Sequence, residues 1–371
     1  MAGAARPRLS RGIMGRLRLA SQGLVGPGLG TVPDAVRWMT AMQAQDLQAA
    51  LWAVGQRVPG SGIEDVRSAL DRAEIVRSWP MRGTLHLLAP EDLRWMLALT
   101  SGRMIRGMAG RHRELGITSG DVQAARGAAL RLVSGGGAAT REELFQAFQA
   151  AGQPTAGQRG IHLLSMLCQR GWLVQGPLRG RQQLVVAFGE WIPESRELDR
   201  EEGIAELLLR YLRSHGPATE RDFAWWSGIP LTEVRTALAG VRHELVGLEF
   251  EGTGYWLSPA TAALLDHGVP GARSVLALPG FDEFLLGYTD RSLVLPARHA
   301  DKIVPGGNGM FRKTIVAGGE VVGTWAGPGT GRGADVVPEP FDGVNGLRPA
   351  AQKSFGLQAA KYRRFLGSGK P

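Results

Sequence analysis

Two glutamines separated by one residue, Gln43 and Gln45, stand between two segments with helical patterns. On one continuous helix their side chains would point about 200° apart, because an α-helix has about 3.6 residues per turn. In an extended corner, residues i and i+2 point to the same side, so the two amides can converge on one point. Asp46 is suited to cap the second helix, which would place both glutamines in such a corner. The alternative is that they are ordinary surface glutamines in a polar helix corner.

The chemistry open to this pair is limited, because a neutral amide is not a strong base near neutral pH. An amide can hold a water molecule, and its carbonyl oxygen can stabilise a developing positive charge. Asp46 is the alternative base. A carboxylate that caps a helix accepts hydrogen bonds from backbone amides, which makes it a weaker base. We therefore expect a structural role for Asp46 and a substrate that is already activated.

The basic residues indicate a nucleic-acid partner. The formal net charge is +9, and every lysine lies at or after Lys302. Arginine binds phosphate through two parallel hydrogen bonds and stacks on bases. Codon bias is an alternative cause of the Arg/Lys ratio, but it does not explain the net charge. The candidate DNA-binding residues lie on expected hairpins and are Arg77, Arg82, Arg179, Arg181, Arg312 and Lys313. For each of them a solvated surface role is the alternative.

Cysteine and histidine give no indication of a metal centre, and we expect no cofactor. Cys168 is the single cysteine, which excludes an intrachain disulfide and a metal site of the Cys/His type. It lies in an apolar helical run and is expected to be buried. His112 and His162 show no ligand spacing, and His86 fits a core position. No stretch is apolar over the length of a bilayer, and the Arg-rich N-terminus lacks the apolar segment of a signal peptide, so we expect a cytoplasmic protein.

Three segments share one plan, in which short amphipathic helices precede a β-hairpin. The clearest echo compares residues 137–145 with 216–223, where Thr140 and Thr219 are good N-caps followed by acidic residues. In these two copies the expected helices are 156–170 and 231–243, the strands are 172–175, 183–186, 248–250 and 255–257, and the turns are 176–181 and 252–254. Helices followed by a two-stranded wing are typical of winged-helix modules.

The first segment fits this plan less obviously, and the last segment differs from it. In the first segment the expected helices are 34–42, 46–57, 63–73 and 90–100, and the hairpin strands are 75–79 and 84–88. From residue 274, short alternating strands and Gly/Pro turns are typical of a small antiparallel sheet or barrel. There the expected strands are 274–278, 293–295, 311–316 and 321–325, with a turn at 317–320 and a closing helix at 350–365.

These patterns predict an α+β protein with three tandem winged-helix modules and a C-terminal antiparallel β-domain. A chain of 371 residues is long enough for several modules. The expected boundaries are 1–118 for the first winged helix with the glutamine corner, 119–198 for the second, 199–270 for the third and 271–371 for the β-domain.

Several motifs resemble one known family. They are Gln43-Ala44-Gln45-Asp46 with Leu51-Trp52-Ala53, the run Arg77–His86, Phe281–Tyr288 and Gly323-Thr324-Trp325. In these residues the chain resembles the AlkZ-like winged-helix DNA glycosylases over nearly its whole length, apart from about the first 15 residues. The catalytic motif of that family is Gln-apolar-Gln, which Gln43, Ala44 and Gln45 match. A sister branch carries Asp in place of the second glutamine.

The resemblance implies a C-shaped channel around double-stranded DNA and hydrolysis of the N-glycosidic bond of N7- or N3-alkylated purines. Such bases are cationic and leave as neutral molecules, so the amides of Gln43 and Gln45 suffice as catalytic groups. Bulky interstrand crosslinks, such as azinomycin adducts, are candidate substrates beside simple alkylation damage. We expect a monomer. No lysine lies near the motif in the sequence, so a Schiff-base lyase step is not expected and the enzyme would be monofunctional.

The alternative function is a winged-helix transcriptional regulator without catalysis. An uninterrupted basic recognition helix would favour the regulator, and the sequence shows none. A scaffold protein is a third class, for which the basic charge offers no reason. The Gln-Ala-Gln corner therefore favours the enzyme.

Overall fold

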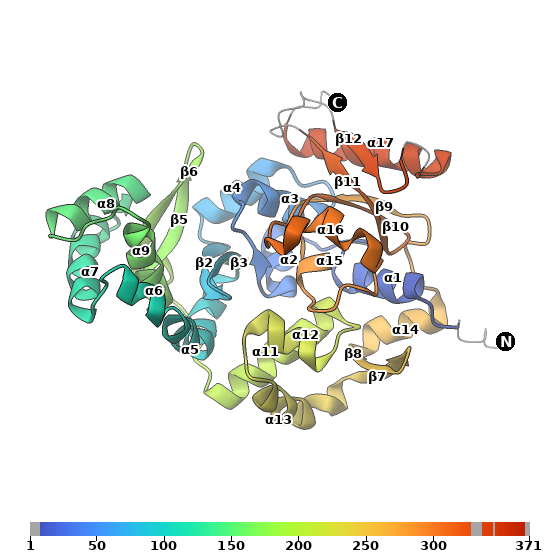
Figure 1. Cartoon of the computed structure of the whole chain (residues 1–371), viewed down its shortest axis with the longest axis horizontal. Helices are drawn as coiled ribbons and strands as arrows, with labels where there is room; N and C mark the ends of the chain where they lie inside the picture. Colours follow the sequence, from blue (N-terminus) through green and yellow to red (C-terminus); the bar gives the residue numbers. More distant parts are fainter. Residues whose placement is uncertain (1–7, 328–335, 344–345, 368–371) are drawn as a thin grey trace. The chain divides into compact units, whose positions relative to one another are not determined.

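The computed structural model describes residues 8–327, 336–343 and 346–367 (Figure 1). The chain divides into two compact units, one of residues 67–204 and one of residues 1–66 with 205–371. The fold class is α+β, as predicted, and the paired strands within each unit are antiparallel. In the described part of the chain, no helix combines the length and apolar character needed to cross a membrane.

The unit of residues 67–204 packs helices against an antiparallel sheet. Its helices are α5 (Pro90–Gly107), α6 (Ala109–Glu114), α7 (Ser119–Val133), α8 (Arg141–Ala150), α9 (Arg159–Gln169) and α10 (Phe188–Trp191). Its strands are β2 (Val76–Met81), β3 (Thr84–Leu88), β4 (Ala138–Ala139), β5 (Leu173–Arg179) and β6 (Gln182–Ala187), in the sheet order β3-β2-β5-β6-β4. Leu144, Leu163 and Val185 lie in its core together with Cys168, which is buried as predicted.

The other unit joins the two ends of the chain. Its N-terminal elements are α1 (Arg11–Ser21), α2 (Val32–Met39), β1 (Met42–Gln43) and α3 (Leu47–Arg57). The chain leaves this unit within α4 (Ile63–Asp71) and returns within α11 (Arg200–His215). Its later helices are α12 (Glu220–Ser227), α13 (Leu231–Val241), α14 (Pro259–His267), α15 (Glu283–Leu286), α16 (Ala300–Ile303) and α17 (Pro349–Phe365). Its later strands are β7 (Val246–Phe250), β8 (Thr253–Leu257), β9 (Val275–Leu278), β10 (Thr314–Ala317), β11 (Glu320–Ala326) and β12 (Val337–Pro340), arranged as the hairpin β7–β8 and the sheet β12-β11-β10-β9.

The two echoed segments repeat one local structure. The helices α7, α8 and α9 precede the hairpin β5–β6, and α11, α12 and α13 precede β7–β8. Thr140 and Thr219 are N-caps with complete capping boxes, as predicted. The residue before each cap pairs with the second strand of its hairpin, Ala139 with Val185 and Ala218 with Trp256. The shared plan is therefore present in the backbone, whereas the four predicted domain boundaries stay a prediction.

Turn chemistry shifts several of the expected boundaries. The helix expected at 34–42 ends at Met39, because Thr40 has a φ of +67° and leaves the helical region. The turn expected at 176–181 involves only two residues, since β5 continues to Arg179 and Gly180 adopts a φ of +64°. A glycine at a positive φ allows this tight connection without steric cost. In the third segment, the turn lies at residues 251–252 instead of 252–254.

The C-terminal region also departs from the sequence pattern. Residues 293–295 form a turn and not a strand, because the amides of Val294 and Leu295 both donate to the carbonyl of Arg291, at 3.0 and 2.8 Å. The strand expected from residue 311 begins at Thr314. In this region α17 agrees with the prediction, whereas β12 was not predicted. Earlier in the chain, α1 and α6 were not predicted either. Helix α1 contributes the fully buried Met14 to the core.

A buried ion pair ties α3 to the start of α15. The fully buried Arg57 guanidinium donates to both carboxylate oxygens of Asp282, at 2.9 and 3.0 Å. It also donates to Gln22 Oε1 at 2.9 Å and to the carbonyl of Ala53 at 2.8 Å. Asp282 in turn caps α15 by accepting a hydrogen bond from the Phe284 amide at 2.9 Å. The planar guanidinium matches a carboxylate in this two-bond geometry, so the pair fixes α15 relative to α3.

Helix α17 lies against β9 and α3 (Figure 1). The ring of Trp52 on α3 has its centroid 4.9 Å from that of Tyr362 and 5.1 Å from that of Phe365. Gly55 leaves room for Phe365, because a Cβ at this position would lie 2.3 Å from Phe365 Cε2. The Trp52 indole N–H donates to the carbonyl of Ala277 on β9 at 2.9 Å. These contacts join α3, β9 and α17 in one packed layer.

Removing the arginine of the buried pair should destabilise this unit strongly. Arg57→Met leaves the Asp282 carboxylate buried without its cation, so the free energy of unfolding should fall by about 3–5 kcal/mol. The exposed pair of Arg11 and Glu251, 2.9 Å apart, is the control, and Arg11→Ala should leave the unfolding midpoint nearly unchanged. Denaturant titration of both proteins, followed by tryptophan fluorescence, measures the difference. Equally small effects would show that the pair does not anchor α15.

Candidate active site

The segment between α2 and α3 is a corner, as the spacing of its glutamines predicts. Thr40 turns the chain out of α2, and the two-residue strand β1 holds Gln43. Residues 45 and 46 form a bend, and α3 begins at Leu47. Gln43 and Gln45 therefore both lie outside a helix.

The two glutamines differ in their surroundings. Gln43 is half-buried, and its side-chain carbonyl oxygen is buried with no hydrogen-bond partner among the described residues. Gln45 is exposed. Buried carbonyl oxygens in native proteins nearly always have a partner, so the Gln43 oxygen is a candidate acceptor for a water molecule or a ligand. Convergence of the two amides on one point stays a prediction.

Asp46 caps α3, as predicted. Its Oδ1 accepts a hydrogen bond from the Ala49 amide at 3.1 Å, and the side chain is exposed. This contact satisfies one of the free N–H groups of the first helical turn. The structural role expected for Asp46 is thus present.

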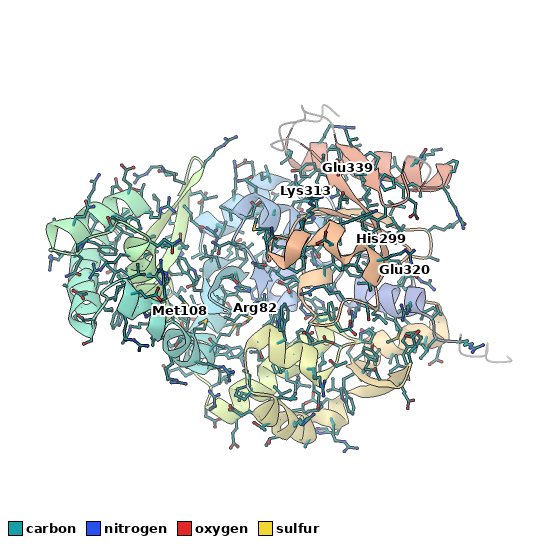
Figure 2. All side chains as sticks on the ribbon, in the orientation of Figure 1. Arg82, Met108, His299, Lys313, Glu320 and Glu339 are labelled. Atoms are coloured by element: carbon teal, nitrogen blue, oxygen red, sulfur yellow. The ribbon has the colours of Figure 1, made fainter. Side chains whose placement is uncertain are left out.

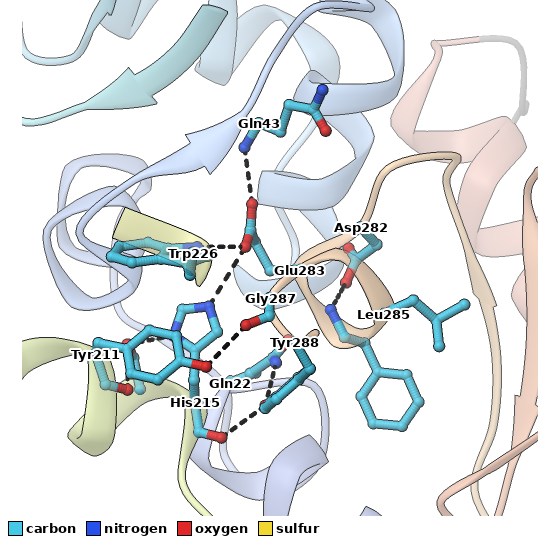
Figure 3. Close-up of polar contacts among 12 residues, drawn as sticks. Gln22, Gln43, Tyr211, His215, Trp226, Asp282, Glu283, Leu285, Gly287 and Tyr288 are labelled. Carbon is cyan, nitrogen blue, oxygen red and sulfur yellow. Dashed lines mark hydrogen bonds and ion pairs between the residues drawn. The ribbon is translucent and has the colours of Figure 1, made fainter. Parts of the chain in front are cut away.

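A buried carboxylate contacts the backbone of Gln43 (Figure 3). Glu283, of which 1% is exposed, accepts a hydrogen bond from the Gln43 backbone N–H through Oε1 at 3.0 Å. Its Oε2 accepts one from the Trp226 indole N–H at 3.0 Å and lies 3.5 Å from His215 Nε2. Residues of β1, α11, α12 and α15 therefore meet behind the corner.

Aromatic rings and hydroxyl groups enclose His215. The Tyr211 ring stacks on it with centroids 4.7 Å apart and an interplanar angle of 13°. The Tyr288 hydroxyl donates to the His215 backbone carbonyl at 2.6 Å, and the Tyr211 hydroxyl donates to the Gly287 carbonyl at 2.8 Å. Burial raises the pKa of both tyrosines, so they stay neutral hydrogen-bond donors.

Glu283 and His215 are not among the site residues predicted from the sequence. Trp226 is fully buried, and its indole N–H donates to the Glu283 carboxylate. The available signal was the acidic pair Asp282-Glu283 inside an apolar segment, because buried carboxylates need partners. Nothing in the sequence indicates that one of these partners is the backbone of Gln43.

Lys313 carries a charge that interacts with that of Asp46, the residue after the glutamine motif. Its side chain is half-buried, with the amine 4.7 Å from the centroid of the Trp325 ring. Burial lowers the pKa of Lys313, and the negative charge of Asp46 partly opposes this by raising it. Such an effect requires proximity. Lys313 is therefore a lysine whose charge interacts with the corner although it is remote from the glutamine motif in the sequence.

The basic candidates in the unit of residues 67–204 have different surroundings. Arg77 is buried and donates to Gln183 Oε1 at 2.9 Å. Arg82 occupies the β2–β3 turn, where one of its terminal nitrogens lies 3.0 Å from Nε2 of the buried His86 (Figure 2). Two further candidates, Arg179 and Arg181, are exposed at the β5–β6 turn, and Arg179 lies 3.8 Å from Glu143.

The two basic candidates of the C-terminal region precede β10 and do not lie on its hairpin turn. The backbone N–H of the exposed Arg312 donates to the Ile303 carbonyl at 3.0 Å, and Lys313 follows it directly. No comparison bears on the role of any of these basic residues in binding, so their contacts to DNA stay a prediction.

His112 and His162 contact each other in the unit of residues 67–204. The rings of His112 and His162 meet edge to face with centroids 5.4 Å apart, and burial lowers the pKa of both. Within residues 8–327, 336–343 and 346–367, no three His, Cys, Asp or Glu side chains gather in a way that could hold a metal ion.

The chain matches the model of a family of DNA glycosylases over most of its length. The family model described as DNA glycosylase AlkZ-like matches residues 36–365, which is most of the chain. The protein belongs to this family. Membership favours the enzyme over the transcriptional regulator.

A curated protein and a solved structure are similar to this chain. The chain is 26% identical over 307 residues to an interstrand DNA cross-link repair glycosylase of Streptomyces sahachiroi, covering 79% of this chain and 81% of the relative. The solved structure of Streptomyces sahachiroi DNA glycosylase AlkZ has a TM-score of 0.81 with 24% identity, covering 97% of this chain and 98% of that chain. The second comparison concerns the fold.

Substitutions at Asp46 should separate capping from basicity. Asp46→Ala removes the acceptor of the Ala49 amide and should lower the free energy of unfolding by about 1 kcal/mol. Asp46→Asn keeps a capping oxygen without the charge and should retain most of that stability. Thermal unfolding of the two proteins measures the difference, and a loss of the same size in both would contradict the capping role.

Proposed function

We propose that the protein is a monofunctional glycosylase that hydrolyses the N-glycosidic bond of cationic N7- or N3-alkylated purines in double-stranded DNA. The observation that carries the proposal is the buried Gln43 carbonyl oxygen without a partner, in a corner that also holds Gln45. In a native protein, a buried acceptor without a partner is expected at a site that must bind a ligand.

The proposed reaction needs no strong base. The bond between the sugar C1′ and the purine nitrogen breaks, and its electron pair neutralises the positive charge of the alkylated base. The amide oxygen of Gln43 stabilises the positive charge that develops on the sugar, and Gln45 orients the water molecule. The water oxygen bonds to C1′ and releases a proton to solvent. An unmodified purine would leave as an anion, so such a site should not excise it.

Duplex DNA is the proposed partner of the basic residues, with the protein acting as a monomer built of the predicted winged-helix modules. Arg179, Arg181 and Arg312 are exposed and can reach phosphates without rearrangement. Arg82 and Lys313 are half-buried, so only part of each side chain is open to DNA. Arg77 is buried against Gln183 and would have to move to do so. The relative from Streptomyces sahachiroi is named for interstrand cross-link repair, which makes bulky crosslinks candidate substrates beside simple methylated purines.

Removal of either amide should slow excision. Gln43→Ala and Gln45→Ala should each lower the single-turnover rate on duplex containing N7-methylguanine, on the order of 10²-fold for the loss of one positioned stabilising group. Gln45→Asp should retain part of the rate, because the sister branch of the family carries Asp there.

DNA affinity serves as the control for these proteins. It should hardly change, because neutral amides add little to binding dominated by phosphate contacts. Comparing a methylated duplex with a crosslinked duplex separates the two substrate classes. If both alanine variants bind DNA and excise at the unmutated rate, the catalytic assignment of the corner is wrong.

The proximity of Lys313 to Asp46 makes the monofunctional reaction testable at one residue. An amine that formed a Schiff base with the sugar would be trapped covalently by borohydride. We expect abasic product without strand cleavage and without a trapped adduct. Lys313→Ala is the control. An adduct that forms with the unmodified protein and disappears in this variant would overturn the proposal and identify Lys313 as a lyase nucleophile.

A further inference from the structure

The side chain of Glu283 has no role in the proposed chemistry. It is almost fully buried, and it uses its two oxygens separately: Oε1 accepts from the Gln43 backbone and Oε2 from the Trp226 indole, each at 3.0 Å (Figure 3). Burying a carboxylate costs free energy unless hydrogen bonds and charges compensate it. A carboxyl group that is buried in contact with the backbone of the glutamine corner is a candidate for a role in that corner.

The corner has little backbone structure of its own to fix it. Strand β1 is two residues long, and the chain enters it from Thr40, whose φ of +67° is unfavourable for a β-branched residue. The hydrogen bond from the Gln43 N–H to Glu283 therefore restrains the backbone that carries the Gln43 side chain. The stabilisation that an uncharged amide gives to a developing charge depends on its orientation. Small displacements of a reacting group lower rates steeply.

A glutamine could not replace this carboxylate. Two N–H groups, one from Gln43 and one from Trp226, point at two different oxygens of Glu283. A side-chain amide has one oxygen and one NH₂ group, so one of the N–H donors would face another donor. His215 Nε2, 3.5 Å from Oε2, lies beside the Trp226 donor and adds a nitrogen on the same side.

We propose that Glu283 is a positioning residue for Gln43, held in place by Trp226 and His215. The inference rests on the proposed function, since it concerns the amide that we assign to excision. Glu283 acts through Gln43 and does not itself contact the substrate.

The test compares two buried carboxylates of the same unit. Glu283→Gln should lower single-turnover excision of N7-methylguanine from duplex DNA on the order of 10²-fold, with unchanged DNA affinity. Asp222→Asn is the matched control. Asp222 is 1% exposed and accepts hydrogen bonds from the amides of Thr219 at 2.9 Å and Thr289 at 3.0 Å, neither of which belongs to the glutamine corner. It should lower the unfolding midpoint while the folded protein keeps its rate.

A rescue variant separates positioning from simple loss of stability. In the double variant Glu283→Gln with Trp226→Phe, no indole donor opposes the NH₂ group, so the amide oxygen can face the Gln43 N–H. We expect part of the lost rate to return, a non-additive result that a general destabilisation would not give. Trp226→Phe alone keeps the ring and removes one anchor of the carboxylate, so we expect a several-fold lower rate with unchanged affinity.

The outcomes distinguish the inference from the function on which it rests. A Gln43→Ala protein with the unmutated rate contradicts the proposed function. An impaired Gln43→Ala protein beside a Glu283→Gln protein with the unmutated rate contradicts the inference alone. If Glu283→Gln does not fold, Trp226→Phe decides, and an unmutated rate in that variant overturns the positioning role.

Discussion

Arg57 and Asp282 meet in the interior of the protein, where neither side chain has appreciable contact with solvent. The pair connects the C-terminal end of α3 to the N-terminal end of α15, and the corner with its glutamines adjoins the opposite end of α3. A helix transmits position along its axis because its backbone hydrogen bonds keep it rigid. The residue after Asp282 is Glu283, which returns to the corner and bonds to the Gln43 backbone. Helix α3, α15 and the corner therefore form a closed arrangement in which each contact restrains the next.

This arrangement suits chemistry performed by neutral groups. A catalytic acid or base can act from several orientations if its pKa is right, whereas an amide contributes only a fixed dipole and a lone pair. The backbone of the corner contacts a buried carboxylate that accepts a hydrogen bond from an indole and lies beside an imidazole, and a tyrosine hydroxyl donates to the backbone of that histidine. The corner itself carries the side-chain amides of Gln43 and Gln45 and the capping carboxylate of Asp46. Selectivity would then come from the leaving group, since only a base that is already cationic departs without further help.

Local signals in the sequence were sufficient for part of this structure. Thr140, Thr219 and Asp46 are helix caps because the side chain and the amide it serves lie three residues apart, so the sequence contains both partners. The corner at Gln43–Gln45 follows from the same argument. The strand predicted at residues 293–295 is a turn, because three consecutive apolar residues are compatible both with a buried strand and with a buried turn. Turn lengths were missed where a single glycine, Gly180, allowed a shorter connection.

Contacts between distant segments were beyond the reach of these signals. Glu283 and the Gln43 backbone are 240 positions apart, and nothing in the residue types selects this partner from other backbone amides. The same holds for Lys313 and Asp46, whose proximity arises only when β10 and α3 are packed in one unit. The resemblance to a family indicated Gln43 and Gln45 as site residues. It did not indicate the residues that contact this motif from distant segments.

The close approach of Phe365 to Gly55 links two positions near opposite ends of the sequence. The aromatic ring occupies the space that a side chain on α3 would fill, so neither residue can change size independently. A relative with a larger residue at the first position must carry a smaller one at the second, or must dock its last helix elsewhere. Paired substitutions at these two sites in a relative would then indicate that its last helix docks on α3 at the same place.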